Sequence, residues 1–404
     1  RGFDYLDMAT GLAKEMESPP AVMVVYDSLP VGDPAVLPPV PVVSGDPADQ
    51  PLRWVYSTSG TTSDPKGVRH IDATLIAGGI GMAESLDMSP DDVGSMAFPY
   101  THIGGPDYLF TVLAVGFPVI LLETFVPEEA VPVLRRHGAT MAGGTTAFYQ
   151  AFVNEQRKQP HEPIIPTLRL LSGGGAPKPP EVFFEVKRVM HIPCVHGMAM
   201  TEVPMGAMGS PHDTDEQLAY TDGKPIRDLE IKIVDEDGVE VPTGTNGELR
   251  VRGPMVCKGY TRPELTAAAF DEDGFFRTGD LAHVRADGHV VATGRIKDII
   301  IRKGENISAK DIEDLLYQHP KIAEVAVIGL PDNERGERVC AVIETVRGQT
   351  PLTLPELKEY CRQAGLMNQK IPEQLENVED FPRNATLKIL KFQLRQQFAD
   401  KPWP

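Results

Sequence analysis

Residues 57–67 read STSGTTSDPKG and directly follow residues 54–56, an apolar segment that predicts a strand. Glycine lets the backbone bend until successive N–H groups point inward, hydroxyls add neutral donors, and the Lys66 ammonium supplies a charge for phosphoryl oxygens. We interpret this loop as a polyphosphate cradle. The residues that would bind ATP are Thr58, Ser59, Gly60, Thr61, Thr62 and Lys66.

A solvated loop and a Walker A phosphate loop are the two other interpretations of this segment. A Ser/Thr/Gly run between a strand and a helix is most often a solvated connection. The Walker A pattern places Gly-Lys-Ser/Thr after a glycine and four further residues, whereas here five residues separate Gly60 from Lys66, and Gly67 follows the lysine. The spacing therefore disfavours a P-loop kinase or motor.

Length and composition predict a globular protein of at least two domains. The chain has 404 residues, 41% hydrophobic and 24% charged, and a single core stops growing at roughly 250–300 residues. The longest apolar stretch, residues 109–122, contains Thr111, Gly116 and Pro118 and is shorter than the ~18 residues of a membrane span. We expect a buried helix followed by a strand there, and no transmembrane segment.

The net charge and the cysteines indicate which kinds of partner and which cellular compartment to expect. With 39 basic and 57 acidic residues the net charge is −18, which repels phosphate backbones, so no nucleic-acid partner is expected. The cysteines at 194, 257, 340 and 361 form no CxxC pair and no zinc-like spacing, so we expect structural thiols and a cytoplasmic location. The chain begins at Arg1 and its first 50 residues are proline-rich, so we expect a fragment without its true N-terminus.

The pattern of strands and helices changes along the chain. Between residues 56 and 211, short apolar runs alternate with helical stretches such as 128–137 and 146–156, which predicts a largely parallel, helix-covered sheet. Between residues 229 and 294, alternating strands carry turn pairs typical of hairpins, so an antiparallel subdomain is expected. Those pairs are Asp237-Gly238, Asn246-Gly247 and Asp287-Gly288.

A compact α+β pattern follows Arg295. It contains a helix capped by Ser308 and ending at Gln318, strands near 324–330 and 339–345, and a helix around 354–364. This segment is long enough to form a small domain of its own.

Four later segments make the function more specific: HGMAMTE at 196–202, FRTGD at 276–280, GRIKD at 294–298 and PRNATLK at 382–388. Together with the loop at 57–67, their order and spacing resemble those of the adenylate-forming enzymes, which include acyl-CoA synthetases, peptide-synthetase adenylation domains and firefly luciferase. The resemblance runs from about residue 52 to the C-terminus.

The resemblance implies an α/β protein with a large N-terminal AMP-binding domain, residues 1–296, and a small mobile α+β C-terminal domain, residues 297–404. Members usually have a longer N-terminal region than this chain. The implied reaction uses ATP and Mg²⁺ to convert a carboxylic acid into an acyl-adenylate with release of pyrophosphate, after which coenzyme A takes the acyl group. A homo-oligomer is possible.

Several segments would hold the nucleotide. Residues 172–177 read SGGGAP and would let a flat base lie against the backbone, although a strand-end turn explains them as well. By resemblance the adenine-side residues are Gly174, Gly175, Ala176, Pro177, His196, Gly197, Met198, Ala199 and Met200. Met198 stands where the family commonly has an aromatic residue and Ala199 where it commonly has glycine, which bears on nucleotide affinity.

Two acidic side chains suit the ribose and the metal. Asp280 presents two acceptor oxygens for ribose hydroxyls, and Arg295 is its expected companion donor. Thr201 and Glu202 offer a hydroxyl and a hard carboxylate, a pair that fits the α-phosphate and Mg²⁺. Taken alone, Thr-Glu is more often a helix cap and Gly-Asp more often a turn.

Three further residues are assigned by the resemblance. His102 would border the carboxylate and acyl pocket, although a lone histidine among apolar residues is usually part of a core. Lys297 would be the hinge between the domains. Lys388 would bridge the substrate carboxylate, the α-phosphate and the ribose oxygen, and Leu387 replaces the usual glycine before it.

Two alternatives remain open from the sequence. The acyl group could pass to a carrier protein supplied in trans, or the chain could be a catalytically silent nucleotide- or acyl-binding protein. Residues after Pro99 offer Tyr, Thr and His where amino-acid-activating members have Asp, which argues against an α-amino acid, although Asp107 weakens that point. The segments 102–108 and 143–151 would line the pocket for an acid that the sequence does not identify.

Overall fold

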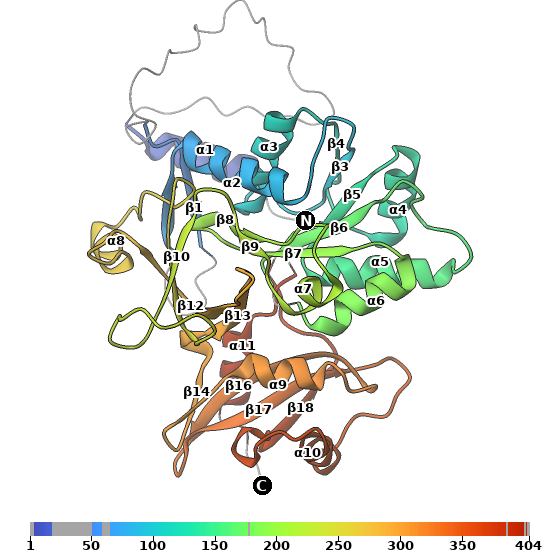
Figure 1. Cartoon of the computed structure of the whole chain (residues 1–404), viewed down its shortest axis with the longest axis vertical. Helices are drawn as coiled ribbons and strands as arrows, with labels where there is room; N and C mark the ends of the chain where they lie inside the picture. The colour runs from blue at the N-terminus through green and yellow to red at the C-terminus, as the bar shows by residue number, and fades with distance from the viewer. Residues whose placement is uncertain are drawn as a thin grey trace, which may run out of the picture. The chain divides into compact units, whose positions relative to one another are not determined.

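The computed structural model describes residues 4–17, 51–58, 65–176, 178–384, 387–399 and 401. The chain divides into two compact units, residues 1–46 and 47–404. In the first unit, helix α1 (Tyr5–Glu15) begins after Asp4, whose side chain accepts a hydrogen bond from the backbone N–H of Asp7. Every element below belongs to the second unit (Figure 1).

A sheet with parallel and antiparallel pairs carries the motif segments of the first half. Its strands run in the order β5 (Met141–Gly144), β6 (Leu170–Gly174), β7 (Cys194–Met200), β8 (Val203–Met208) and β9 (Lys224–Pro225). The β5–β6 and β6–β7 pairs are parallel, and the β7–β8 and β8–β9 pairs are antiparallel. Helices α5 (Thr146–Lys158) and α6 (Pro180–Met190) connect the parallel strands and pack side by side against them (Figure 1). The predicted helix-covered parallel arrangement is confirmed for these strands.

Glycine at the carboxyl ends of these strands permits close backbone packing. A Cβ on Gly173 would lie 1.7 Å from the carbonyl oxygen of Gly144 in the neighbouring strand. A Cβ on Gly174 would lie 2.5 Å from the carbonyl oxygen of Gly197. The glycines of this segment therefore permit close packing of neighbouring strands. The end of the segment lines the cavity described below, at the carboxyl edge of the strands, where ligands of α/β sheets commonly bind.

Smaller elements surround this sheet. Strands β1 (Trp54–Ser57) and β2 (Gly67–His70) form an antiparallel pair on either side of the 57–67 loop. Strands β3 (Gly94–Met96) and β4 (Val119–Leu121) are parallel and are joined through α3 (Gly104–Val115), so the helix-then-strand order predicted for residues 109–122 is confirmed. The predicted burial of this helix is wrong for its second half, where Leu113 is 68% exposed. The remaining helices of this part are α2 (Asp72–Ser85), α4 (Pro127–Arg136), α7 (Asp215–Tyr220) and α8 (Pro263–Ala269).

The predicted antiparallel subdomain is confirmed, with one turn misplaced. Its strands run in the order β10 (Glu230–Val234), β11 (Gly247–Arg252), β12 (Phe276–Val284) and β13 (Val290–Arg295). Gly238 and Gly288 adopt positive φ in connections between strands, as expected. The prediction of a turn at Asn246-Gly247 was wrong, because Gly247 begins β11 and a Cβ there would lie 2.3 Å from the carbonyl oxygen of Val234.

The segment after Arg295 forms a second sheet with its own helices. Strands β16 (Ile322–Asp332) and β17 (Gly336–Thr345) pair antiparallel, and β18 (Gln374–Val378) pairs parallel with β17. The other elements are the short 3₁₀ helices η3 (Ile296–Asp298) and η4 (Asn368–Lys370), strands β14 (Ile300–Arg302) and β15 (Glu305–Ile307), and helices α9 (Ala309–Leu316), α10 (Leu354–Gln363) and α11 (Lys391–Phe398). Ser308 caps α9 as predicted, by accepting from the backbone N–H of Asp311.

The buried apolar side chains form separate clusters. One extends from Val68 to Val290, and two others lie between Ile300 and Phe398. All four cysteines are buried and unpaired, consistent with structural thiols. Among the described helices, none is long and apolar enough to cross a membrane.

Candidate active site

Two adjoining cavities collect every predicted site residue that the structure describes. The first has a volume of about 920 Å³ and the second about 1020 Å³. Predicted residues lining only the first are His102, Thr58, Lys66, Gly174, Met200, Thr201 and Glu202; those lining only the second are Ala176, His196, Met198 and Asp280. Both cavities are lined by Gly175, Gly197, Ala199, Arg295, Lys297 and Lys388. Segments from residue 58 to residue 388 therefore meet at one place.

Four predicted ATP-binding residues of the phosphate loop lie outside the described residues, namely Ser59, Gly60, Thr61 and Thr62, as does Pro177 of the adenine-side segment, and their nucleotide contacts stay predictions.

The two ends of the phosphate loop are held together by their backbones. The Thr58 N–H donates to the carbonyl oxygen of Lys66 at 2.9 Å, and the Lys66 N–H donates to Thr58 Oγ1 at 3.2 Å. The Lys66 ammonium lies 5.2 Å from the centre of the Tyr260 ring. This contact keeps the cation beside the first cavity without neutralising it.

Residues from distant segments fix the turn between β7 and β8. Thr201 and Glu202 form this turn rather than the helix cap weighed from sequence. Nε2 of His70 lies 2.8 Å from the carbonyl oxygen of Thr201, and since a carbonyl can only accept, the ring donates from this nitrogen. The Tyr260 hydroxyl donates to Glu202 Oε1 at 2.7 Å. Burial lowers the pKa of His70 to about 4, which keeps the ring neutral, and raises the pKa of Tyr260 far above its usual value.

The ribose-side candidates are paired across strands β12 and β13. The strand register sets Asp280 opposite Arg295, and Arg295 Nε lies 2.7 Å from Asp280 Oδ1. Asp280 is buried, and burial raises the pKa of its carboxyl in spite of Arg295. An ion pair uses one of the two carboxylate oxygens, which leaves acceptor capacity for ribose hydroxyls.

Lys388 reaches this cluster from a loop after β18. Asn384 Oδ1 accepts from the Lys388 N–H at 2.9 Å, and the Asn384 N–H donates back to the Lys388 carbonyl oxygen at 3.0 Å. Burial, followed by the charge of Arg295, lowers the pKa of the Lys388 ammonium to about 8. Leu387 adopts φ 64°, the left-handed conformation that glycine occupies without a steric penalty. The replacement of the usual glycine thus keeps a glycine-like backbone.

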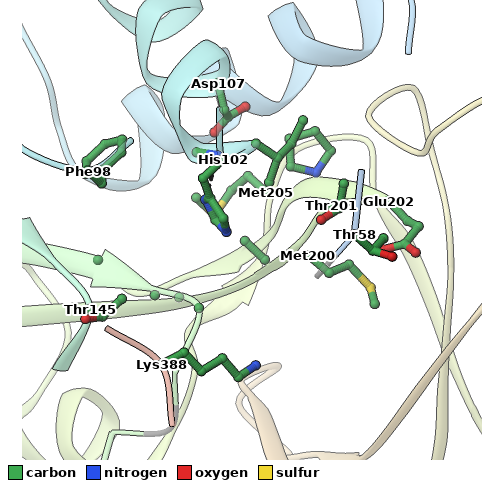
Figure 2. A pocket seen from close by; sticks show the side chains of 18 of the residues that line it. Thr58, Phe98, His102, Asp107, Thr145, Met200, Thr201, Glu202, Met205 and Lys388 are labelled. Atoms are coloured by element: carbon green, nitrogen blue, oxygen red, sulfur yellow. Dashed lines mark hydrogen bonds between the residues drawn. The ribbon is translucent and has the colours of Figure 1, made fainter. Parts of the chain in front are cut away.

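His102 has a defined tautomer. Its Nδ1 accepts from the backbone N–H of Gly104 at 3.2 Å, so in the neutral ring the proton resides on Nε2. Protein groups around the ring, which displace part of its hydration, and then the charge of Lys388 lower the pKa of His102 below its ordinary value. The neutral ring therefore offers one N–H donor to the first cavity. In the view of Figure 2, His102 lies between Asp107 and Lys388.

On the adenine side, His196 contacts the segment that follows β6. His196 is buried, and its Nε2 lies 3.0 Å from the carbonyl oxygen of Ala176. This bond fixes the bend after β6 and makes His196 a support for the strand end. Met198 lines the second cavity, at the position where the resemblance implies an aromatic residue.

The remaining lining of the first cavity is mostly apolar and can accept an acyl group. It includes Phe98, Ile103, Tyr108, Met141 and Phe148. Residues 143–145 and Phe148 also face this cavity, as expected for part of the 143–151 segment. Asp107, on α3, is a buried acid in this surface.

The donor set fits a magnesium ion held jointly with a phosphorylated substrate. No group of three or more His, Cys, Asp or Glu side chains suited to a metal is found among the described residues. Mg²⁺ keeps several waters and commonly uses one or two carboxylates together with substrate phosphates. Glu202, whose Oε1 also accepts from Tyr260, is a suitable single carboxylate.

Sequence analysis missed two supporting residues, His70 and Tyr260. They lie 131 and 58 positions from the residues they contact, and neither carries a local signal for that contact. Gly259-Tyr260 follows strand β11 in a turn-rich segment, which alone predicts only a loop.

Known proteins match over most of this chain. Residues 6–261 match the family description "AMP-binding enzyme", and residues 311–388 match "AMP-binding enzyme C-terminal domain". The chain is 35% identical over 355 residues to the medium-chain fatty-acid–CoA ligase of Escherichia coli, covering 85% of this chain and 61% of that ligase. It is 33% identical over 414 residues to the salicyl-AMP ligase / salicyl-S-ArCP synthetase of Mycobacterium tuberculosis, covering 98% of this chain and 71% of that protein.

A solved structure has the same fold. ATP-bound MatB from Rhodopseudomonas palustris superposes with a TM-score of 0.80 at 30% identity, covering 86% of this chain and 68% of that one. The chain thus spans less than two thirds of the E. coli ligase and about two thirds of MatB.

Proposed function

Because this chain belongs to the AMP-binding enzyme family, whose members are the adenylate-forming enzymes, we propose that it activates a carboxylic acid with ATP and transfers the acyl group to coenzyme A. The observation that carries the proposal is the meeting of Lys66, Glu202, Arg295 and Lys388 around one cavity with an apolar extension. Three cations and a carboxylate suit a polyphosphate and its metal, and the extension suits an acyl group.

The first half-reaction joins two anions. The carboxylate oxygen attacks the α-phosphorus of ATP, a new O–P bond forms, and the bond to pyrophosphate breaks with its electron pair leaving on pyrophosphate. No general base is needed because the nucleophile is already ionised. Two like charges about 4 Å apart repel by about 4 kcal/mol at an effective dielectric near 20, so catalysis depends on neutralising and positioning them.

We assign this neutralisation to residues on both sides of the cavity. Lys388 would bridge the carboxylate, the α-phosphate and the ribose oxygen, and the Nε2–H of His102 would donate to the carboxylate. The Thr201 hydroxyl would donate to the α-phosphate. Bound Mg²⁺ would supply positive charge to the phosphate oxygens, held by Glu202. Asp280 and Arg295 would fix the ribose.

In the second half-reaction, the coenzyme A thiolate would attack the acyl carbon and release AMP. We propose that the segment 297–404 acts as the small mobile domain, with Lys297 as its hinge, and that it withdraws Lys388 before the thiol enters. The support is the separation of the buried apolar clusters on either side of residues 290–300. Lys297 also lines both cavities.

A second acceptor is favoured by one relative. The M. tuberculosis protein, which matches 98% of this chain, is named a salicyl-S-ArCP synthetase, so a carrier protein is the alternative to coenzyme A. Both alternatives share the adenylation step and differ only in the thiol.

The test is to incubate the protein with ATP, Mg²⁺ and a panel of aliphatic, alicyclic and aryl acids. Parallel reactions contain coenzyme A, a phosphopantetheinylated carrier protein or no thiol, and AMP and acyl products are measured by mass spectrometry. Acid-dependent AMP with acyl-CoA supports the proposal. Acyl transfer to the carrier protein alone supports the carrier-protein alternative. The absence of AMP with every acid contradicts both functions.

A further inference from the structure

Asp107 is a buried acid among the residues that line the first cavity. The residue is 1% exposed, and among the described residues its Oδ1 has no hydrogen-bond partner. It lies in the first turn of α3, among the residues that line the cavity. Buried polar side chains are nearly always hydrogen-bonded, so an unpaired one in a binding cavity calls for an explanation.

The packing of two helices holds this carboxyl in place. A Cβ on Gly78 of α2 would lie 2.5 Å from Asp107 Oδ1. A Cβ on Gly79 would lie 2.8 Å from the Thr111 backbone nitrogen. The glycines therefore let α2 approach α3 closely, and a larger residue at position 78 would displace the acid. Thr111 Oγ1 donates to the carbonyl oxygens of Asp107 and Gly79, which ties the two helices together.

The surroundings determine the protonation of Asp107. Apolar and aromatic residues that line the same cavity include Ile103, Tyr108 and Met205, and within the described part of the chain no basic group forms an ion pair with Asp107. Burial raises the pKa of the Asp107 carboxyl to about 8, so the group is mostly protonated at neutral pH. A neutral carboxyl both donates and accepts one hydrogen bond, and a hydroxyl group complements it in both respects.

The position of Asp107 defines which end of a substrate it would meet. In Figure 2, Asp107 and Lys388 lie well apart in the cavity, with His102 between them in this view. An acid whose carboxylate meets Lys388 and His102 would extend toward α3 with the other end of its acyl group.

We propose that Asp107 is a specificity-determining residue that hydrogen-bonds a hydroxyl group on the acyl portion, remote from the carboxylate. The substrate class is therefore a largely apolar carboxylic acid with one remote hydroxyl. This inference rests on the proposed function for the orientation of the acid. A site built to hydrogen-bond a substrate group discriminates strongly against the analogue that lacks it, because the buried protein group is then left unpaired.

The test compares matched pairs of acids that differ only in a hydroxyl, such as ω-hydroxy and unsubstituted aliphatic acids and para-hydroxy and unsubstituted aryl acids. Binding is measured by calorimetry in the presence of a non-hydrolysable ATP analogue, and kcat/KM is measured by AMP release. The protein is expected to prefer a hydroxylated acid over its partner at least about tenfold in both measurements. Asp107→Leu should remove or reverse that preference.

Two further variants make the result interpretable. Asp107→Asn conserves volume and hydrogen bonding and should retain much of the preference, so it serves where Asp107→Leu folds poorly. Thr221→Val removes a buried hydroxyl that donates to the carbonyl oxygen of Gln217 and lines neither cavity, and it should leave the ratio of the paired acids unchanged.

The outcomes separate this inference from the proposed function. Equal binding of the paired acids, a preference for the unsubstituted members, no binding of any hydroxylated acid, or a preference that survives Asp107→Leu overturns the inference. A hydroxyl preference in binding that depends on Asp107, without AMP release, supports the inference and contradicts the proposed function.

Discussion

The two sides of the first cavity are held in different ways. Thr201 and Glu202 sit in a strand-to-strand turn that is fixed by His70 and Tyr260. Lys388 sits in a loop that Asn384 bonds locally and that Arg383 anchors by pairing with Glu324 on β16. The turn at Thr201 and Glu202 is thus supported by residues before Arg295, whereas the lysine loop is anchored on the sheet that follows Arg295. This difference suits a site in which the metal and phosphate side stays fixed and the lysine side serves only one half-reaction.

The strongest test of this difference is Lys388→Ala. Loss of one preorganised cationic donor costs on the order of 10²–10³ in rate, so adenylate formation should fall by that amount. Thioester formation from a supplied acyl-adenylate should persist, since the lysine would act only in the first step. Both half-reactions are measured separately, by pyrophosphate release and by acyl-CoA formation.

Lys401→Ala is the matched control, because Lys401 is half-exposed, pairs with Glu376 and lines neither cavity. It should leave both half-reactions within about twofold, in the range of other surface substitutions. An equal loss of the two half-reactions in Lys388→Ala would show that the lysine side does not act in one step alone.

The pH dependence of adenylation is the second test of the difference between the Lys388 side and the Glu202 side of the cavity. The pKa of Lys388 is lowered to about 8, so the active ammonium is present below that pH and is lost as pH rises through it. The kcat/KM for adenylation, which reports free-enzyme groups, should therefore fall about tenfold per pH unit well above 8. The measurement is a profile from pH 6.5 to 10 for each half-reaction, and a fall of the same size in thioester formation would contradict the assignment.

Lys297→Pro tests the connection between the two sides. Proline fixes φ and should restrict rotation at η3, so thioester formation should fall about tenfold more than adenylation. Lys297→Ala removes the charge without restricting the backbone and is the control. An unchanged ratio of the half-reactions in the proline variant would remove Lys297 as the hinge.

Tyr260→Phe tests the support of the fixed side. It deletes the hydroxyl that donates to Glu202 at 2.7 Å and keeps the ring beside Lys66. A hydrogen bond to a charged group contributes about 1.5–3 kcal/mol, so the Mg²⁺ concentration for half-maximal adenylation should rise roughly tenfold or more, with a smaller change in kcat at saturating Mg²⁺. Tyr56→Phe, a cavity-lining tyrosine, is the control. A loss of kcat that saturating Mg²⁺ does not restore would argue against metal positioning.

The sequence alone predicts site residues that belong to contiguous motifs, but not contacts between distant segments. Residues in contiguous motifs, such as Thr201, Asp280 and Lys388, could be found because their chemistry and spacing are local. His70, Tyr260 and the unpaired Asp107 depend on contacts between distant segments, which no window of sequence contains. Asn246-Gly247 was misjudged for the opposite reason, because glycine there meets a steric requirement of strand packing, and composition alone does not distinguish that from a turn.

The smallest effect is expected at Leu387, where the lysine loop stores local strain. The residue adopts φ 64° and its side chain is 39% exposed, so it holds a left-handed conformation with little burial in return. Leu387→Gly removes a steric penalty of roughly 1–2 kcal/mol and adds about 0.5–1 kcal/mol of backbone entropy in the unfolded chain. The free energy of unfolding should therefore rise by no more than about 1 kcal/mol, as measured by urea denaturation. Adenylation should change by less than about threefold, since the glycine preserves the backbone that positions Lys388. Leu387→Ala retains the strain and serves as the control. If Leu387→Gly were instead to abolish adenylation while leaving stability intact, the leucine side chain itself would be part of the site, and the backbone of the lysine loop would not by itself account for the position of Lys388.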